Sequence, residues 1–225
     1  MIGALLAGGY GKRLHSLTEE IPKVLLPLRE NYVILDRQLE DFKKAGIETI
    51  YILTGFKGRM IEERYGKEWN GMSLRYLREE VPMGTLWAVR NLFLHTDSDV
   101  LLRNGDTICD LELRKFVDSS LHNKTPATIM VVKMRSPFGI VSIRGRIVRK
   151  FSEKPVLPYY INGGTYFLKR GIGDYLKRSY RAKDIEDTLF KYIATRGMIS
   201  AFKYKGFWKP IDTAKDYEEI RNIFR

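Results

Sequence analysis

The chain is poor in cysteine, glutamine and histidine, and it has no long apolar run. Its 225 residues include one cysteine, Cys109, one glutamine, Gln38, and three histidines without metal-ligand spacing. A single cysteine excludes a disulfide framework and a cysteine-rich zinc site. No apolar stretch approaches the roughly 20 residues that span a bilayer, and residues 1–6 do not look like a secretory signal. These absences predict a soluble, cytoplasmic protein, and the scarcity of glutamine is typical of heat-adapted chains.

The chain contains enough apolar residues for a packed core. Its charged residues are unevenly distributed between its two halves. The composition is 44% hydrophobic and 29% charged, which excludes a disordered chain. The net charge of +12 belongs to the second half, because residues 1–112 carry 15 basic and 17 acidic side chains and residues 113–225 carry 24 and 10. A basic half indicates an anionic partner, such as nucleic acid, lipid headgroups or a phosphorylated substrate. The alternative is a solvated lysine-rich surface, and charge alone does not decide between them.

Short apolar runs alternate with amphipathic stretches along the chain. Strands are predicted at 2–6, 49–54, 74–77, 99–103, 128–133 and 159–168, helices at 35–45, 58–65, 85–94, 111–121, 185–195 and 213–224, and a hairpin at 140–151. This order predicts an α/β fold with a Rossmann-like mixed, mainly parallel sheet flanked by helices. We expect one domain over residues 1–225, with the hairpin as a β-rich insertion.

A glycine-rich segment directly follows the first strand. Residues 6–13 read Leu-Ala-Gly-Gly-Tyr-Gly-Lys-Arg, and backbone N–H groups in such a turn can converge on an anion. The segment is not a P-loop, because no Gly-x4-Gly-Lys-Ser/Thr spacing exists. It is not a dinucleotide fingerprint either, because Leu14 stands where the third glycine would be. Alone, the loop is a weak indication of phosphate binding.

Further sequence motifs follow this glycine-rich loop in a fixed order along the chain. They are Ile-Pro-Lys-Val-Leu-Leu-Pro at 21–27, Met-Gly-Thr at 83–85, Asn-Gly-Asp at 104–106, Phe-Gly-Ile-Val at 138–141, Glu-Lys-Pro at 153–155, Ile-Asn-Gly-Gly at 161–164, and Gly-Phe-Trp at 206–208 with Asp212. In this order they resemble the sugar-1-phosphate nucleotidylyltransferases. Lys12 departs from the family's usual threonine. The carboxylate at Asp212 comes later than in most members and is similar to the glucose-1-phosphate cytidylyltransferase version.

The resemblance implies an Mg²⁺-dependent enzyme that transfers a nucleotidyl group from a nucleoside triphosphate to a sugar 1-phosphate. It implies a catalytic set of Arg13, Lys23, Asp106 and Asp212, of which Asp106 and Asp212 would hold the Mg²⁺. Nucleotide contacts would come from Leu6, Ala7, Gly8, Gly9, Gly11, Lys12, Glu79, Gly84, Thr85 and Gly105, mainly in residues 1–112. Sugar-phosphate contacts would come from Gly139, Glu153, Lys154, Asn162 and Gly163, mainly in residues 113–225. We expect no nucleic-acid or membrane partner and no left-handed β-helix, and self-association stays open.

Glu79, five residues before Gly84, bears on the choice of base. A carboxylate only accepts hydrogen bonds, and guanine presents two adjacent donors, N1–H and N2–H₂. Uracil shows one donor between two acceptors, and cytosine has its N4 amine to give. Residues 79–85 also resemble the guanylyltransferases that act on mannose or heptose 1-phosphate, so GTP and a manno-configured sugar are predicted.

Alternatives to this prediction stay open. Glu79 as a solvated surface residue would leave the base undefined, and the C-terminal segment favours CTP or UTP with glucose 1-phosphate. A catalytically inactive regulatory or scaffold relative is another class of function. The joint presence of Arg13, Lys23, Asp106, Lys154 and Asp212 argues against an inactive relative.

Overall fold

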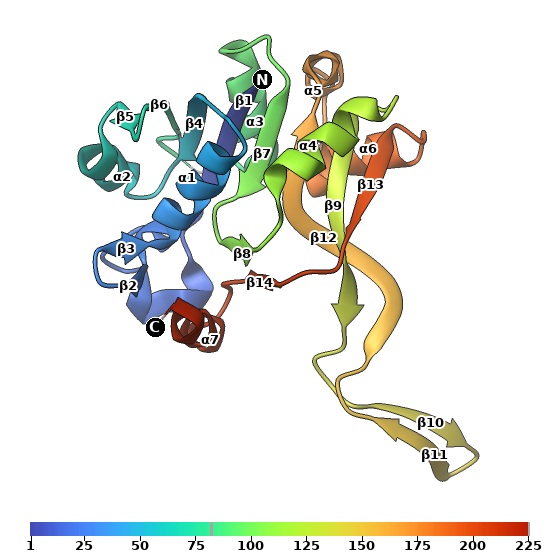
Figure 1. The fold of residues 1–225 in the computed structure, drawn as a ribbon. Helices are drawn as coiled ribbons and strands as arrows, with labels where there is room; N and C mark the ends of the chain where they lie inside the picture. The colour runs from blue at the N-terminus through green and yellow to red at the C-terminus, as the bar shows by residue number, and fades with distance from the viewer. Residues whose placement is uncertain (82, 225) are drawn as a thin grey trace.

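The computed structural model describes residues 1–81 and 83–224, and the side chains of residues 12, 15 and 16 also fall outside the description. One eight-stranded sheet, in the order β13-β9-β12-β7-β1-β4-β6-β5, runs through it (Figure 1). Its strands are β1 (Ile2–Ala7), β4 (Thr49–Thr54), β5 (Glu68–Trp69), β6 (Met72–Arg78), β7 (Val100–Asn104), β9 (Ala127–Arg135), β12 (Val156–Leu168) and β13 (Ile199–Tyr204). Within these described ranges, three two-stranded pairs lie outside the sheet: β2 (Pro27–Arg29) with β3 (Tyr32–Val33), β8 (Thr107–Cys109) with β14 (Trp208–Pro210), and β10 (Ile140–Arg144) with β11 (Ile147–Ser152).

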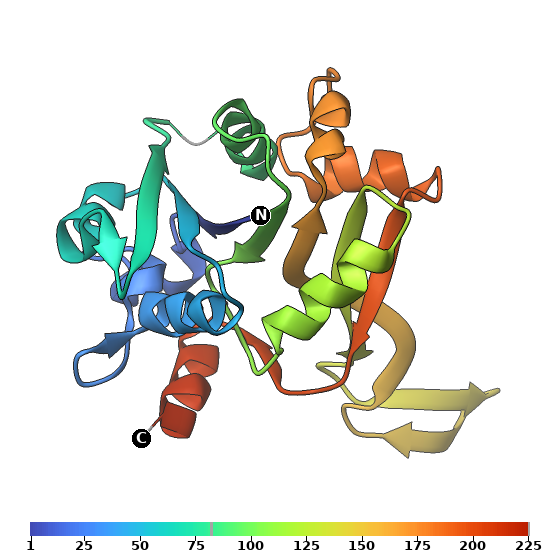
Figure 2. The ribbon, with the colours of Figure 1, turned by 45° about the horizontal axis from the view of Figure 1, so that its top comes forward.

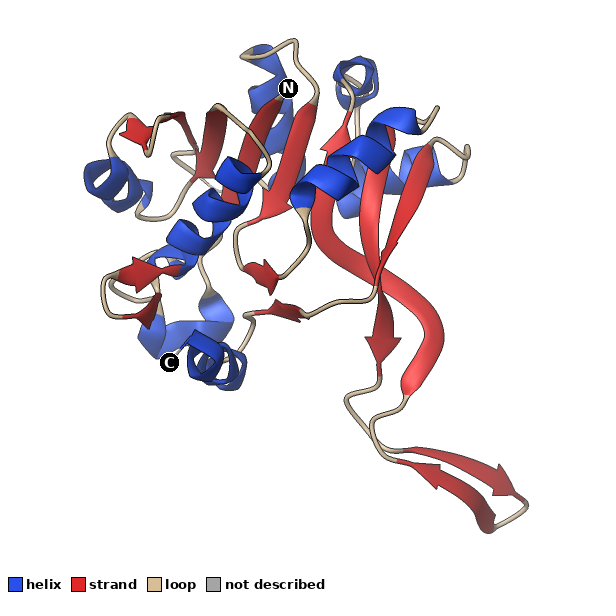
Figure 3. Cartoon of the chain, viewed as in Figure 1, coloured by secondary structure: helices blue, strands red, loops and turns tan. Residues whose placement is uncertain are grey.

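Helices flank the sheet on both faces (Figure 3). The α-helices are α1 (Ile34–Lys44), α2 (Gly58–Tyr65), α3 (Thr85–Leu94), α4 (Leu113–His122), α5 (Gly173–Leu176), α6 (Lys191–Ala194) and α7 (Ala214–Phe224). The 3-10 helices are η1 (Lys12–Leu17), η2 (Lys23–Leu25) and η3 (Arg170–Ile172), and η4 (Glu186–Phe190) is a π-helix. None of the helices in the described ranges is both long and apolar enough to cross a bilayer.

The directions of the strands show at which edge of the sheet a ligand site is expected. β1 pairs in parallel with β4 and β7, and β4 pairs in parallel with β6. Their carboxyl ends therefore meet at one edge of the sheet, which is where open α/β sheets bind ligands. β12 is antiparallel to both β7 and β9, while β9 and β13 are parallel, so the sheet is mixed.

Two cores cover the two faces of the sheet, and a third lies beside it. Successive residues of a strand point to opposite faces, so Leu5 packs with α1 and α4 in one core while Ala4 packs with α3 and α6 in the other. The third core joins α7 to the segments around η1, β2 and β8. It contains Ile108 and Ile211, so it fixes the two loops that carry Asp106 and Asp212.

Two of the sequence expectations need correction. The predicted helix at 185–195 begins as the π-helix η4, in which Phe190 N–H donates to Ile185 O at 3.0 Å, and becomes α-helical only in α6. Strand β13 was not predicted, because each of its two faces mixes polar and apolar residues: Ile199, Ala201 and Lys203 alternate with Ser200, Phe202 and Tyr204. The mixed sheet and flanking helices confirm the predicted fold class.

The predicted hairpin forms an arm, residues 138–152, that projects from the body (Figure 1). Its large apolar side chains face solvent, with Ile143 64% exposed and Phe151 66% exposed. A two-stranded ribbon of this kind is marginally stable alone. The arm joins the body between β9 and β12. Figure 2 shows the arm from a second direction, still clear of the body.

Candidate active site

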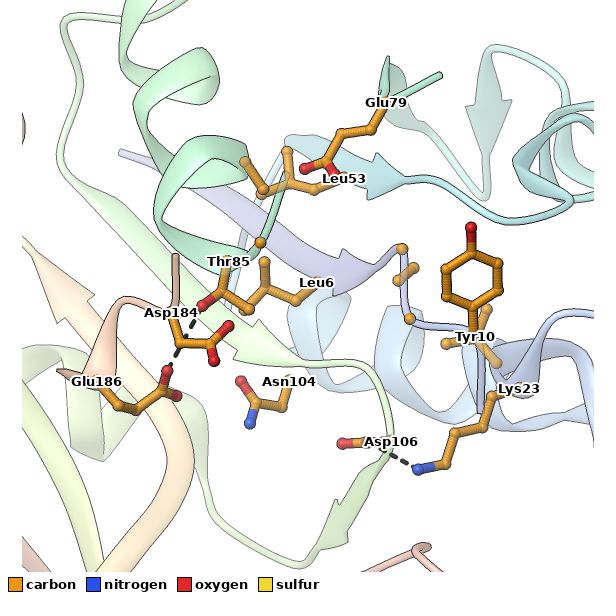
Figure 4. A pocket seen from close by; sticks show the side chains of 16 residues that line it. Leu6, Tyr10, Lys23, Leu53, Glu79, Thr85, Asn104, Asp106, Asp184 and Glu186 are labelled. Carbon is orange, nitrogen blue, oxygen red and sulfur yellow. Dashed lines mark hydrogen bonds and ion pairs between the residues drawn. The ribbon is translucent and has the colours of Figure 1, made fainter. Parts of the chain in front are cut away.

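A cavity of about 330 Å³ opens at the carboxyl edge of the parallel strands (Figure 4). Its walls come from the loop after β1, from η2, from the ends of β4, β6 and β7, from the start of α3, and from the segment that leads into η4 together with the first residue of η4. The lining residues are Leu6, Ala7, Gly8, Gly9, Tyr10, Lys23, Val24, Leu53, Glu79, Gly84, Thr85, Ala88, Asn104, Asp106, Asp184 and Glu186. Nine of them belong to the set predicted from the sequence.

The glycine-rich loop forms one wall of the cavity. Leu6 to Gly9, for which nucleotide contacts are predicted, line the cavity, and Tyr10 lies beside Phe56 with ring centroids 5.2 Å apart. Gly11 has a positive φ of 62°, and its carbonyl accepts from Leu14 N at 2.7 Å where η1 begins. Gly11 therefore turns the chain away and is not itself in the lining. The side chain of Lys12 lies outside the described residues.

Two aspartates and two basic residues come together at the floor of the cavity. Lys23 and Asp106 belong to the lining, whereas Arg13 and Asp212 lie just outside it. Lys23 Nζ is 2.7 Å from Asp106 Oδ2 and 3.7 Å from Asp212 Oδ1, and Arg13 Nη2 is 2.8 Å from Asp212 Oδ1. Asp106 and Asp212 are far apart in sequence but lie within reach of one ammonium group. The four residues of the predicted catalytic set are thus brought together.

The turn that carries Asp106 requires a glycine. Gly105 N donates to Leu6 O at 2.9 Å, and a Cβ on Gly105 would lie 2.6 Å from that oxygen. The loop after β7 can therefore approach β1 closely only with glycine at this position. Gly105 acts by shaping the turn and is not among the residues that line the cavity.

The carboxylate pair fits a hard divalent cation. Mg²⁺ is usually held by one or two protein carboxylates together with substrate phosphates and water. Within the described part of the chain, no three His, Cys, Asp or Glu side chains group as metal ligands. A cation on Asp106 and Asp212 would therefore take its other ligands from phosphate oxygens and water, as Mg²⁺ does.

Glu79 lies in the wall opposite this floor. Its Oε2 accepts from Met83 N at 3.0 Å, and its own N–H donates to Thr54 O at 2.9 Å. The side chain is half-buried, and this burial raises its pKa, while the bond from Met83 N acts in the opposite direction. Glu79 is therefore a residue of the cavity and not a freely solvated glutamate.

The start of α3 joins this wall to the segment before η4. Gly84 has a φ of 91°, and a Cβ there would lie 2.6 Å from Lys183 O. Thr85 Oγ1 accepts from Ile185 N at 2.9 Å and lies 3.5 Å from Glu186 Oε2. These contacts hold Asp184 and Glu186 against the cavity.

Asp184 and Glu186 form an acidic wall of the cavity that the sequence did not predict. Glu186 Oε1 accepts from the buried Tyr166 hydroxyl at 3.2 Å, and burial raises the pKa of Tyr166, which keeps it a neutral donor. Asn104 Oδ1 is buried and has no partner among the described residues. Asn104 directly precedes the Gly-Asp pair and could have been found there. Asp184 and Glu186 belong to no motif, and only the fold brings them beside Thr85.

The predicted sugar-phosphate residues lie outside the lining. Gly139 and Glu153 are exposed neighbours at the base of the arm, where a Cβ on Gly139 would lie 2.9 Å from Glu153 Oε2, and Lys154 follows them with a φ of 44°. Asn162 Nδ2 donates to Tyr166 Oη at 2.7 Å, one layer behind the acidic wall. Gly163 O accepts from Trp208 Nε1 at 2.9 Å.

Comparison with known proteins identifies the chain's family. The family model described as nucleotidyl transferase matches residues 2–224. The chain belongs to the nucleotidyl transferase family. A D-glycero-α-D-manno-heptose 1-phosphate guanylyltransferase of Aneurinibacillus thermoaerophilus is 31% identical to this nucleotidyl transferase and covers 99% of both chains. A mannose-1-phosphate guanylyltransferase catalytic subunit beta of Xenopus tropicalis is 28% identical over 96% of this chain, which spans 62% of that relative.

A solved structure shares the whole fold. HddC from Yersinia pseudotuberculosis superposes on this nucleotidyl transferase with a TM-score of 0.75, at 27% identity over 100% of both chains. The structure of HddC complexed with GMP-PN gives a TM-score of 0.76 at 25% identity, again over 100% of both chains. The resemblance noted from the sequence motifs is thereby confirmed.

Proposed function

We propose that this nucleotidyl transferase is a guanylyltransferase that joins the guanylyl group of GTP to a manno-configured sugar 1-phosphate and releases pyrophosphate. The observation that carries the proposal is the meeting of Lys23, Asp106 and Asp212 at one end of a cavity whose other end holds Glu79. Relatives named as heptose-1-phosphate and mannose-1-phosphate guanylyltransferases support the choice of substrates.

The reaction needs alignment and charge neutralisation more than a base. An oxygen of the sugar phosphate attacks the α-phosphorus, and the bond to the β-phosphate oxygen breaks with its electron pair leaving on pyrophosphate. A phosphate monoester has a second pKa near 6, so the nucleophile is already anionic at pH 7. The protein therefore has to hold the two anions in line and stabilise the leaving group.

The charged residues at the floor fit these tasks. Arg13, whose side chain is 72% exposed at the rim, would hold the departing pyrophosphate, and the largely buried Lys23 would hold the phosphates at the reacting centre. Mg²⁺ on Asp106 and Asp212 would supply charge neutralisation at the α-phosphate and the sugar phosphate. Both basic residues are paired with aspartates now and would exchange these partners for phosphate oxygens.

Glu79 would read the base. Met83 N occupies one acceptor position of Oε2, and each carboxylate oxygen can accept two hydrogen bonds. Guanine N1–H and N2–H₂ could therefore be accepted side by side. Thr85 and Gly84 would border the base, and the glycine-rich loop would contact the rest of the nucleotide.

The sugar half of the proposal rests on the basic part of the chain. Among the described residues that line the cavity, Glu79, Asp106, Asp184 and Glu186 are acidic and Lys23 is basic. Because Arg13 would hold the pyrophosphate, a further cation for the sugar phosphate would come from outside this lining. Lys154 at the base of the arm would provide it, with Glu153, Gly139 and Asn162 contacting the sugar. Residues 1–112 would thus mainly bind nucleotide and residues 113–225 mainly sugar phosphate.

A substrate panel tests this function directly. Four nucleoside triphosphates are combined with mannose, heptose and glucose 1-phosphates, and pyrophosphate release is measured. We expect GTP with mannose or heptose 1-phosphate to give the highest kcat/KM. Preference for CTP or UTP with glucose 1-phosphate would contradict the guanylyl assignment. An absence of turnover with every pair would instead favour an inactive relative.

A further inference from the structure

Asp106 and Asp212 are joined by a very short ribbon. β8 and β14 pair over three residues, Ile211 N donates to Asp106 O at 2.8 Å, and Asp110 N donates to Phe207 O at 3.2 Å. A ribbon of this length has little stability of its own. The relative position of the two carboxylates therefore depends on whatever holds the ribbon from outside.

The outer edge of β8 is held by side chains of a helix. Alternate carbonyls of a strand point to opposite edges, so Thr107 O and Cys109 O face away from β14. Gln38 Nε2 on α1 donates to Thr107 O at 2.7 Å, and Arg37 Nη2 donates to Cys109 O at 3.2 Å. In the described part of the chain no strand pairs with this edge, and two side chains of α1 take the place of that strand.

Gln38 is a costly residue at this position. It is fully buried, and its Oε1 has no hydrogen-bond partner among the described residues. An unpaired buried polar group destabilises the folded state, so an apolar side chain would suit the core better. What the amide contributes is a single donor, aimed at the carbonyl of the residue that follows Asp106.

We propose that Gln38 is a positioning residue that fixes Asp106 relative to Asp212 and Lys23. The inference rests on the proposed function, because it assigns Gln38 a part in metal-assisted nucleotidyl transfer. Without the amide, Thr107 O would be buried and unpaired, and the ribbon could shift along α1. Displacements of about 1 Å at reacting groups can lower a rate by 10²-fold.

The test compares Gln38→Met with a matched control. Methionine keeps the length and burial of glutamine but has no donor. Ser120→Ala is the control, because Ser120 Oγ is equally buried and donates to Phe116 O at 2.7 Å within α4, away from the ribbon. Mn²⁺ affinity is measured by electron paramagnetic resonance of the free ion, alongside kcat, the KM for GTP and Tm on the full chain.

We expect Gln38→Met to bind Mn²⁺ about 10-fold more weakly and to lose about 10-fold in kcat, as is typical when a partner behind a metal ligand is removed. The KM for GTP should stay within about threefold of the wild-type value, because the base and the glycine-rich loop are untouched. Ser120→Ala should lose a similar amount of Tm but keep wild-type Mn²⁺ affinity and kcat.

Wild-type Mn²⁺ affinity and kcat in Gln38→Met, with Tm lowered as in the control, would overturn the inference. If Gln38→Met does not fold, Gln38→Asn decides by the same measurements, because it keeps the amide but shortens its reach by one methylene. A wild-type protein that transfers no nucleotide would refute the proposed function, while the Mn²⁺ affinities would still test the role of Gln38.

Discussion

At the scale of single residues, Glu79 is the side chain on which the choice of nucleotide depends. Glu79→Gln places an amide NH₂ where guanine requires an acceptor, so one donor on the base loses its partner. Hydrogen bonds to charged groups are worth about 1.5–3 kcal/mol, and kcat/KM for GTP should fall roughly 10–100-fold. UTP use should be unchanged or improved, and Tm should barely move. Steady-state rates with GTP, UTP and CTP decide this, and an equal loss for all three would remove Glu79 as the base reader.

The same residue predicts a pH dependence. Burial raises the pKa of Glu79, and only the deprotonated carboxylate can accept both guanine donors. As the pH falls, kcat/KM for GTP should therefore drop at a pH above the ordinary pKa of glutamate, about 4.3. The ratio of wild type to Glu79→Gln, measured from pH 4 to 8, cancels the ionisation of the substrates. A ratio that is constant with pH would contradict the prediction.

The two aspartates at the floor of the cavity should be individually indispensable. Asp106→Asn and Asp212→Asn each remove one carboxylate from a site that has two, so each should abolish most turnover and weaken Mn²⁺ binding. Circular dichroism and Tm check that the fold is intact. Turnover of Asp212→Asn within a few-fold of wild type would show that the late aspartate is misassigned.

At the scale of elements, the base of the arm is where the proposed sugar-phosphate contacts lie. Lys154→Ala should raise the KM for the sugar 1-phosphate about 10-fold or more and leave the KM for GTP nearly unchanged, because it removes a cation from one substrate only. Lys150→Ala is the matched control, since Lys150 is an exposed lysine on β11. Equal effects of the two substitutions would mean that the arm acts only through its overall charge.

Helices and strands with a regular repeat of apolar residues were predictable from the sequence, and very short strands were not. Strand 49–54 and helices 58–65 and 85–94 form with the predicted bounds. The β8–β14 ribbon has three residues a strand, too few for any alternation to be read. It forms because Ile108 and Ile211 enter the third core and because α1 holds the outer edge of β8.

The residues of the site also divide into those that the sequence predicts and those that it does not. Residues within two positions of a strand's end, such as Gly8 after β1 and Asp106 after β7, were predicted because a motif marks the end of that strand. Asp184 and Glu186 reach the cavity through a contact between Thr85 and Ile185, a hundred residues apart. A pairing of that kind depends on tertiary packing, which no local pattern of residues encodes.

At the scale of the whole molecule, the uneven charge agrees with the proposal that residues 1–112 mainly bind nucleotide and residues 113–225 mainly bind sugar phosphate. The cavity walls are acidic, and the excess of basic residues lies in the half that contains the arm. In the proposed reaction, two anionic substrates must meet beside carboxylates that would hold a cation. A basic second half would draw the sugar phosphate toward a cavity that would otherwise repel it.

The last prediction concerns a buried charge that links α1 to the central strand β7. Arg103 is 1% exposed, its Nη1 lies 3.0 Å from Asp41 Oδ2, and Arg37 also contacts Asp41. Burial lowers the pKa of Arg103, but a guanidinium stays charged at neutral pH. Asp41→Asn would leave this charge in the core without a counter-ion, and breaking a buried pair in this way costs about 3–5 kcal/mol.

Urea unfolding measures this loss of stability. Because apolar replacement of both partners of a buried ion pair is often neutral or stabilising, the double variant Asp41→Leu with Arg103→Met should recover most of the loss. The pairing with Cys109, whose Sγ lies 3.3 Å from Arg103 Nη2, is too weak to substitute for the carboxylate. A loss below about 1 kcal/mol in Asp41→Asn would mean that another group neutralises Arg103, and the double variant would then show no recovery.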